Sequence, residues 1–202
     1  MNLNIGCGPY PIEGFINTDI NIRQNVSYLN AETKFNYDDN SFDFIYSCHC
    51  IEHLSYKGFH NYLNETYRCL KPNGVHRVCF PSLDKIKLII NNPENYFDYI
   101  YNVFHFEHED NKINKDNPFI KDNYNDLYSL VISNLFCAWG HNCLYDEKLI
   151  IKLFRATGYK NIVLKQLNES DYPIFKDIEI KNGTNDFILY KQYESSVIEA
   201  TK

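Results

Sequence analysis

A strand, helix and strand pattern in the first half of the chain constrains the fold most. Residues 42–48 and 75–80 are two runs of β-prone, largely apolar residues. Between them, apolar residues recur at spacings of three and four over residues 59–71, which predicts an amphipathic helix stopped by Pro72-Asn73-Gly74. Two strands joined by a covering helix are typical of parallel neighbours in one sheet.

The same alternation continues on both sides of this unit. Further strands are expected at Leu3 to Ile5, Phe15 to Ile20, Val26 to Leu29, Asn161 to Leu167 and Phe187 to Lys191. A helix with the apolar face Leu149, Ile150, Leu153 and Phe154 is expected between the cap Asp146 and the closing Gly158. The sequence therefore predicts an α/β, Rossmann-like domain, with a mostly parallel twisted sheet and helices on both faces.

Residues 84–140 break the alternation. They are rich in aromatic residues and Asn, with helical fragments at Tyr96 to Phe106 and Asp126 to Phe136. Because 202 residues suit one ordinary domain, we expect a single domain, 1–202, with this segment inserted over the active-site face. The aromatic residues at its start are interpreted as core, with a ring-stacking wall as the alternative: Tyr96, Phe97, Tyr99, Tyr101, Phe104 and Phe106.

Composition excludes some classes of partner and compartment. A net charge of −6 without a basic patch argues against a nucleic-acid backbone as the main partner. No signal peptide is visible after Met1, and no apolar run reaches the ~20 residues that span a membrane. Seven cysteines in an irregular pattern suit reduced thiols, so we expect a cytoplasmic protein with no membrane partner.

Glycines and an acid follow the first two expected strands. Gly6-Cys7-Gly8 lies directly after the first strand, and Asp19 lies at the end of the second. Glycines allow the backbone to approach a ligand, and a carboxylate at the neighbouring strand tip can bind a ribose diol. Pro9 and Pro11 stand where a phosphate-binding helix would begin, which disfavours NAD and leaves a nucleoside ligand or a simple turn.

Several motifs in order resemble one enzyme family. They are Leu3-Asn-Ile-Gly-Cys-Gly-Pro, Gly14-Phe-Ile-Asn-Thr-Asp-Ile, Asn40-Ser-Phe-Asp-Phe-Ile-Tyr, Glu52-His-Leu, Leu70-Lys-Pro-Asn-Gly and Leu153-Phe-Arg-Ala-Thr-Gly-Tyr. Over residues 3–84 and 141–167 the chain resembles the class I S-adenosyl-L-methionine (SAM)-dependent methyltransferases. More narrowly, it is similar to a small bacterial branch often associated with surface-glycan synthesis.

This resemblance implies SAM as cofactor and a set of residues that would hold it. Gly6 and Gly8 would contact the methionine part, Asp19 the ribose, residues 30–32 the adenine, and residues 47–49 would lie under the sulfonium. The implied set is Asn4, Gly6, Cys7, Gly8, Asp19, Asn30, Ala31, Ser47 and His49. Two departures are Asn4, which stands at the family's usual acidic position, and the short link between Gly8 and Asp19, which leaves little room for a helix.

The segment Cys48-His-Cys-Ile-Glu-His53 offers metal-ligating side chains. It contains H-x-x-E-H, a zinc-peptidase pattern, but peptidase ligands need a helix and this segment follows a strand. The main interpretation is that Glu52 and His53 cap a turn by hydrogen bonding, so no metal is expected. The alternatives are a metal-assisted methyltransferase with ligands His49, Glu52 and His53, and a zinc site with ligands Cys137, His141 and Cys143.

The expected reaction is methyl transfer from SAM to a small molecule or sugar (glycan) acceptor, onto oxygen. A hydroxyl acceptor must lose a proton, and histidine suits that role at neutral pH. His141 and His49 are the favoured catalytic bases, with His53, His105 and His108 as further candidates. The competing hypotheses are a non-catalytic scaffold that keeps the fold and an NAD-dependent sugar epimerase or dehydrogenase.

Overall fold

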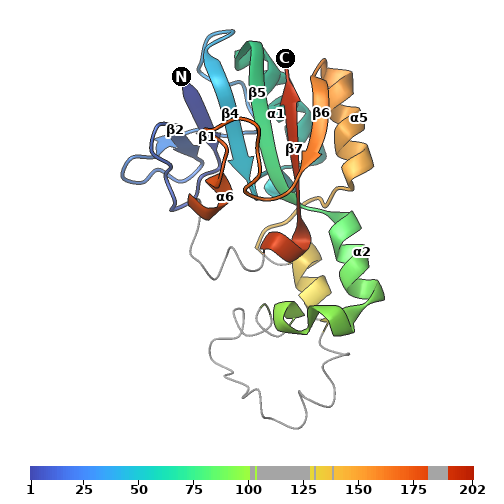
Figure 1. Ribbon diagram of the computed structural model, residues 1–202. Helices are drawn as coiled ribbons and strands as arrows, with labels where there is room; N and C mark the ends of the chain where they lie inside the picture. Colours follow the sequence, from blue (N-terminus) through green and yellow to red (C-terminus); the bar gives the residue numbers. More distant parts are fainter. Residues whose placement is uncertain (101–102, 104–127, 130, 138, 182–190) are drawn as a thin grey trace.

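A seven-stranded sheet forms the centre of the described part of the protein (Figure 1). The computed structural model describes residues 1–100, 103, 128–129, 131–137, 139–181 and 191–202. The strands are β1 (Asn2–Ile5), β2 (Ile16–Asp19), β3 (Ser27–Tyr28), β4 (Phe42–Cys48), β5 (Leu70–Pro81), β6 (Lys160–Lys165) and β7 (Ser195–Thr201). Their order is β3-β2-β1-β4-β5-β7-β6, parallel from β3 to β5, with β7 antiparallel to both β5 and β6. The predicted Rossmann-like α/β fold is confirmed.

Helices cover the two faces of the sheet unequally. The named helices are η1 (Ile51–His53), α1 (Tyr56–Cys69), α2 (Leu83–Asn91), η2 (Pro93–Tyr96), α5 (Glu147–Thr157) and α6 (Ile178–Lys181). Phe59 of α1 and Phe154 of α5 belong to the main core, which also contains Ile45 of β4. On the other face, Phe175 and Ile178 pack near the sheet, so the four-residue α6 and its flanking chain replace a full helix there.

Local capping explains where the two long helices begin and end. The Ser55 side chain accepts the backbone N–H of Gly58 at the start of α1. This helix ends at Cys69 and β5 begins at Leu70, so Pro72-Asn73-Gly74 lies in the strand and the predicted stop was wrong by a few residues. In α5, Asp146 accepts the backbone N–H of Leu149, and Gly158 ends the helix at φ 116°, as predicted.

The last strand lies elsewhere than predicted. The sequence pattern placed a strand at 187–191, but residues 182–190 lie outside the described residues and residues 191–194 form a helical turn. The strand that pairs with β5 is β7, in which six of seven residues are buried. Because both faces of β7 are covered, polar residues such as Ser195 and Glu199 do not produce the alternation that marks a half-buried strand.

A buried ion cluster stabilises the α6 face. The Arg77 guanidinium of β5 is fully buried and lies 2.8 Å from Glu179 Oε2 and 2.7 Å from Glu199 Oε1. It also donates to the backbone oxygen of Glu169 at 2.9 Å. Each buried carboxylate of this cluster therefore has a cation and a hydrogen bond.

Described parts of the predicted insertion lie beyond the carboxyl ends of β4 and β5, where Figure 1 shows α2. Ile89, Tyr99, Ile100, Val103 and Val131 form a small core of their own. Tyr99 is 1% exposed and Tyr96 packs against this core, which agrees with the core interpretation of the aromatic residues. Tyr101, Phe104 and Phe106 lie outside the described residues.

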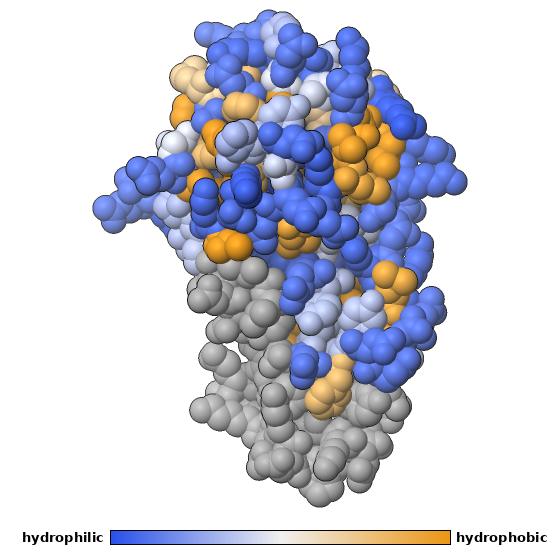
Figure 2. Space-filling model, viewed as in Figure 1, coloured by the Kyte–Doolittle hydropathy of each residue, from blue (hydrophilic) through white to orange (hydrophobic). Residues whose placement is uncertain are grey.

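The surface is largely hydrophilic in the view of Figure 2, with an apolar patch on the side of the edge strand β6. Val163 and Leu164 of this strand are 48% and 44% exposed. Among the helices that the structure describes, none combines the length and the apolar character that crossing a membrane requires.

Candidate functional site

The turn after β1 is shaped by two glycines with different surroundings. Gly6 and Gly8 have φ angles of 67° and 57°, and the backbone N–H of Cys7 donates to Thr18 O at 3.0 Å. A Cβ atom on Gly6 would lie 2.6 Å from Cys50 Sγ, whereas one on Gly8 would meet no atom within 4 Å. Gly6 therefore makes room for the chain around Cys50, and Gly8 borders open space where a ligand can approach the backbone.

Asp19 is fixed at the tip of β2 by backbone hydrogen bonds. Its Oδ2 accepts from Gly8 N at 2.9 Å and its Oδ1 accepts from Asn21 N at 2.8 Å. Arg23 lies 3.8 Å from Oδ1. Since an ionised carboxylate offers about four acceptor positions, Asp19 retains capacity to bind a diol while it holds the glycine turn in place.

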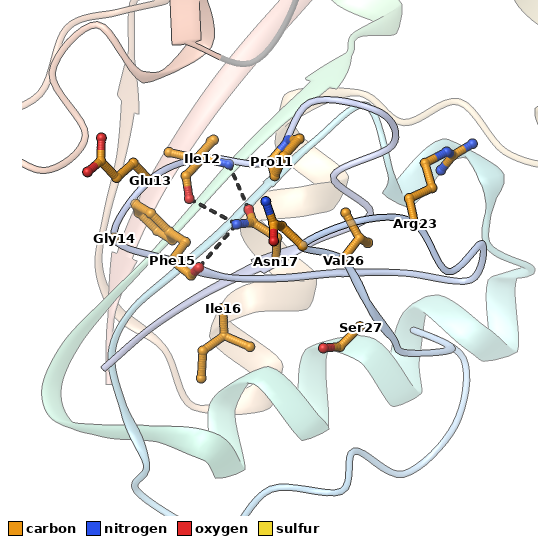
Figure 3. Close-up of a pocket in the computed structure, with 11 residues that line it drawn as sticks. Pro11, Ile12, Glu13, Gly14, Phe15, Ile16, Asn17, Arg23, Val26 and Ser27 are labelled. Atoms are coloured by element: carbon orange, nitrogen blue, oxygen red, sulfur yellow. Dashed lines mark hydrogen bonds between the residues drawn. The ribbon is translucent and has the colours of Figure 1, made fainter.

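The link between β1 and β2 is an irregular loop held by Asn17. Figure 3 shows the Asn17 side chain accepting from Ile12 N (2.8 Å) and donating to Ile12 O (2.9 Å) and Phe15 O (3.1 Å). A hollow of about 660 Å³ runs along this link, and neither Gly8 nor Asp19 lines it. The hollow is thus separate from the glycine turn and its acid.

A second pocket, of about 570 Å³, lies at the carboxyl ends of β1 and β4. Its volume is within the roughly 300–1,000 Å³ of small-molecule sites. It is lined by Ile5, Gly6, Gly8, Asp19, Ile20, Asn21, Leu29, Asn30, Ala31, Glu32, His49, Cys50, His53, Leu54, Ser55 and Asn142. Six of the nine residues predicted to hold the cofactor are among them: Gly6, Gly8, Asp19, Asn30, Ala31 and His49.

The other three predicted residues do not line this pocket. Asn4 is fully buried and its Nδ2 donates to Asn17 Oδ1 at 2.9 Å. The Cys7 side chain is buried, and the Ser47 hydroxyl lies 2.7 Å from the Tyr62 hydroxyl inside the core. Successive strand residues point to opposite faces, so proximity in sequence to a lining residue did not bring these side chains into the pocket.

The rim at residues 30–32 is anchored to the start of α1. The Asn30 side chain accepts from Glu32 N at 2.9 Å, and Glu32 Oε1 accepts from Ser55 N at 2.5 Å. A Cβ atom on Gly58 would lie only 2.2 Å from Glu32 Oε1, so the glycine in the first turn of α1 gives the Glu32 side chain its space. The proposed adenine side is therefore pre-formed.

His49 also lines the pocket and has a left-handed backbone conformation, with φ 49°. Its Nε2 is 2.8 Å from Ser195 Oγ, and its Nδ1 is 3.4 Å from Glu52 Oε1 and 4.0 Å from Glu194 Oε1. Burial, aided by the charge of Lys191, holds the pKa of His49 well below its ordinary value. The imidazole is therefore neutral at physiological pH.

Glu52, His53 and His141 come together beside His49. One ligand atom from each of the three lies within 4.8 Å of the others, and the His53 and His141 ring centroids are 4.9 Å apart. Glu52 is 1% exposed, neither of its carboxylate oxygens accepts a hydrogen bond in the described part of the chain, and burial raises its pKa well above the ordinary value. The prediction that the Glu52 side chain caps the turn was wrong.

Only some of the predicted catalytic histidines and zinc ligands come together in the structure. His141 joins Glu52 and His53, whereas Cys137 is exposed and belongs to no ligand group among the described residues. His105 and His108 lie outside the described residues. The proximity of His141 to Glu52 has no signal in the local sequence because 88 residues separate the two positions.

Two further charged side chains near the site were missed in the sequence. Lys191 is 1% exposed and its Nζ donates to Cys48 Sγ at 3.2 Å, while Glu194 accepts from the Tyr99 hydroxyl. Burial raises the pKa of Glu194 to about 7. Although burial opposes it, the hydrogen bond from Cys79 and the charge of Lys191 lower the pKa of Cys48 to about 6. Lys191 was predicted to end a strand, and no prediction was made for Glu194.

Comparisons with known proteins agree with this geometry. Residues 15–78 match the family model described as a methyltransferase domain. A SAM-dependent methyltransferase from Archaeoglobus fulgidus superposes with a TM-score of 0.52 at 14% identity, over 100% of this chain and 85% of the other. A SAM-dependent methyltransferase from Thermotoga maritima gives a TM-score of 0.52 at 16% identity, over 100% and 81%. No curated protein matches the sequence.

The structural neighbours establish the fold, and the family match covers the segment that runs from the glycine link through β4 to β5. The matched segment includes Asp19, residues 30–32 and His49, which border the pocket. Residues 15–78 therefore match a methyltransferase domain, and the fold of the chain is that of the class I SAM-dependent methyltransferases.

Proposed function

We propose that this protein is a SAM-dependent methyltransferase that transfers a methyl group to a hydroxyl oxygen of a small, polar acceptor such as a sugar. The observation that carries the proposal is that Gly8, Asp19 and His49 line one pocket. We assign Gly8 and Asp19 to the donor end of this pocket and His49 to its acceptor end, because methylation of a hydroxyl requires a site for the nucleoside and a group that accepts a proton.

The donor end of the pocket fits SAM. Gly8 borders open space with a positive φ, Asp19 has acceptor capacity for a ribose diol, and Asn30 and Ala31 lie on a rim held by Glu32. When bound, SAM supplies an electrophilic methyl group on a sulfonium. Because the backbone of the glycine turn is already fixed by Asp19, these residues orient their ligand with little further ordering.

The acceptor end suits a hydroxylated molecule. His49 lines the pocket and its contact with Ser195 fixes the ring, so we assign to this imidazole the proton that the acceptor oxygen loses. His53 and Asn142 add polar groups to this wall. No Tyr or Lys lines the described pocket, which disfavours the NAD-dependent epimerase hypothesis, since that chemistry needs such a pair near the nicotinamide.

We further propose the cytoplasm as the compartment. All seven cysteines are free in the structure, and five of them are buried. Reduced, buried thiols are usual in a reducing compartment.

The test separates binding from turnover. Isothermal titration with SAM should show binding to the wild-type protein and at least about tenfold weaker binding to Asp19→Ala, because a charge-assisted bond to the ribose is worth roughly 1.5–3 kcal/mol. Asp38→Ala, which removes an exposed carboxylate outside the pocket, is the matched control and should bind as wild type.

His49→Gln should lose about 10²- to 10⁴-fold in kcat, as expected when a general base is removed. SAM titration of the same variant measures how much His49 also contributes to holding the cofactor. Methyl transfer is followed with labelled SAM and a panel of sugars and small amines. Absence of SAM binding at millimolar ligand would refute the donor site, and transfer to amines in preference to hydroxyl compounds would refute the acceptor class.

A further inference from the structure

The side chain of Glu52 is a buried carboxylate that receives no hydrogen bond from the described residues. Its carboxylate is 1% exposed, and both oxygens lack a hydrogen-bond donor in the described residues. The closest imidazole nitrogens are His49 Nδ1 at 3.4 Å and His53 Nε2 at 3.9 Å. A buried carboxylate without donors is costly, because it loses its water and gains no equivalent partner.

The backbone brings the three side chains together independently of their own contacts. The carbonyl of Glu52 accepts from Asn142 N at 2.7 Å and from Cys143 N at 3.1 Å, and the Asn142 side chain donates to the His53 carbonyl at 2.7 Å. These bonds join η1 to the segment that carries His141. The donor set is thus positioned before any ligand arrives.

His141 has the tautomer of a metal ligand. Its Nδ1 lies 2.6 Å from the carbonyl oxygen of Leu135, so Nδ1 carries the proton and donates it there. The lone pair is then on Nε2. Metal-binding histidines characteristically donate their other ring N–H to such a carbonyl or carboxylate, which fixes the ring and its tautomer.

We infer that Glu52, His53 and His141 form a binding site for one divalent transition-metal ion of the zinc class, adjacent to the proposed acceptor end of the pocket. Two imidazole nitrogens and one carboxylate are a ligand set typical of catalytic zinc, with room for an exchangeable ligand. Atoms bonded to one ion at about 2.1 Å lie at most about 4.2 Å apart. Metal binding would therefore draw the three atoms, now within 4.8 Å of one another, slightly inward.

A second group of potential metal ligands lies nearby, and its surroundings are less favourable for a cation than those of Glu52, His53 and His141. Cys48, His49 and Cys79 also lie within 4.8 Å of one another. The Lys191 ammonium, however, already donates to Cys48 Sγ at 3.2 Å. A second cation beside this buried ammonium would be repelled, whereas His53, which lines the pocket, gives the Glu52 group access from it.

The metal ion would have a catalytic role if the proposed methyl transfer takes place in this pocket, so this part of the inference rests on the proposed function. His53 lines the pocket together with His49. An ion held there would bind the acceptor oxygen, lower the pKa of its hydroxyl and orient it, while His49 receives the proton. Acceptors with two adjacent hydroxyl groups, as in many sugars, suit an ion that retains more than one open coordination position.

The first experiment measures metal binding without SAM. Untagged, chelator-treated protein is titrated with Co²⁺, monitored by visible absorption, and with Zn²⁺, monitored by calorimetry. One equivalent should bind to the wild type. Glu52→Gln and His141→Ala should each bind at least about tenfold more weakly, since even loss of an outer-shell partner costs 10- to 100-fold. His60→Ala, which removes an exposed histidine of α1, should bind as wild type.

Two outcomes would overturn the inference: no binding of either ion by the wild type, or undiminished binding by both Glu52→Gln and His141→Ala. Circular dichroism verifies that the variants fold. If Glu52→Gln does not fold, His53→Ala is tested in its place, because the His53 side chain is partly exposed. SAM titration of the same samples keeps the two proposals separable. A variant that loses metal binding but still binds SAM tests only the metal-site proposal. Failure of the protein to bind SAM tests only the proposed donor site.

Discussion

Buried carboxylates at two places around the sheet differ in their partners. On the α6 face, Glu179 and Glu199 both contact the Arg77 guanidinium, at 2.8 and 2.7 Å. At the carboxyl ends of the strands, Glu52 is equally buried, but no arginine or lysine lies within ion-pair distance among the described residues and its oxygens accept no hydrogen bond there.

The difference separates a structural role from a functional one. In a buried ion pair, removal of one partner leaves an uncompensated charge in the core and destabilises the fold. A buried carboxylate without a cation leaves binding capacity that an external ligand can use. The following three predictions challenge this distinction, in order of decreasing effect.

Arg77→Met should lower the free energy of unfolding by about 3–5 kcal/mol, because it leaves two buried carboxylates without their cation. Chemical denaturation at neutral pH measures the change. Lys71→Met is the control: Lys71 and its partner Asp43 are 40% and 45% exposed, and such surface pairs contribute about 0–1 kcal/mol. A loss no greater than the control's would mean that the Arg77 cluster does not hold the fold.

His76 tests a third kind of buried group, one satisfied by neutral partners. Its two ring nitrogens lie 2.8 and 2.9 Å from the hydroxyls of Tyr62 and Tyr159, and burial lowers its pKa from 6.5 to about 3. Below pH 6.5 the unfolded chain binds a proton that the folded protein refuses, so stability falls between pH 6.5 and 3. By pH 5.5 the loss from this residue is about 1.4 kcal/mol.

The measurement is the free energy of unfolding at pH 7.5 and 5.5 for the wild type and His76→Gln. The variant should be less stable at both values but should lose about 1.4 kcal/mol less between them. Equal losses in the two proteins would show that His76 accepts a proton in the folded state.

Glu52→Gln should have the smallest effect on the metal-free protein. It removes no hydrogen bond found among the described residues and no cation, so we expect the free energy of unfolding to change by less than about 1 kcal/mol at neutral pH. Thermal and chemical denaturation of chelator-treated samples provide the comparison. A loss as large as that of Arg77→Met would contradict the distinction and make Glu52 a structural carboxylate.

The parts that could be predicted from sequence were those fixed by local patterns. The β-prone run at 42–48 became β4 at those bounds, and the caps Asp146 and Gly158 enclose α5 as expected. Gly8 and Asp19 reached one pocket because parallel strands end at the same edge of the sheet. These features depend on residues close in sequence or on the order of the strands.

The parts that could not be predicted depend on contacts between distant segments. The buried strand β7 lacks an alternating pattern, and Lys191 and Glu194 reach β4 and the insertion only through tertiary packing. Similarly, His141 approaches Glu52 because backbone hydrogen bonds of Asn142 and Cys143 join two loops. Asn4 was assigned to the cofactor through the family resemblance, but its side chain is buried and hydrogen-bonds to Asn17.

The absence of a side chain at Gly6 has a consequence for how this enzyme can change. Since a methyl group there would come within 2.6 Å of Cys50 Sγ, the loop that would cradle SAM and the loop that carries His49 and Glu52 rest directly on each other. Substitutions that enlarge either loop must displace the other. Efforts to alter acceptor preference through residues 49–53 should therefore also shift affinity for SAM, so the two properties will have to be optimised as one.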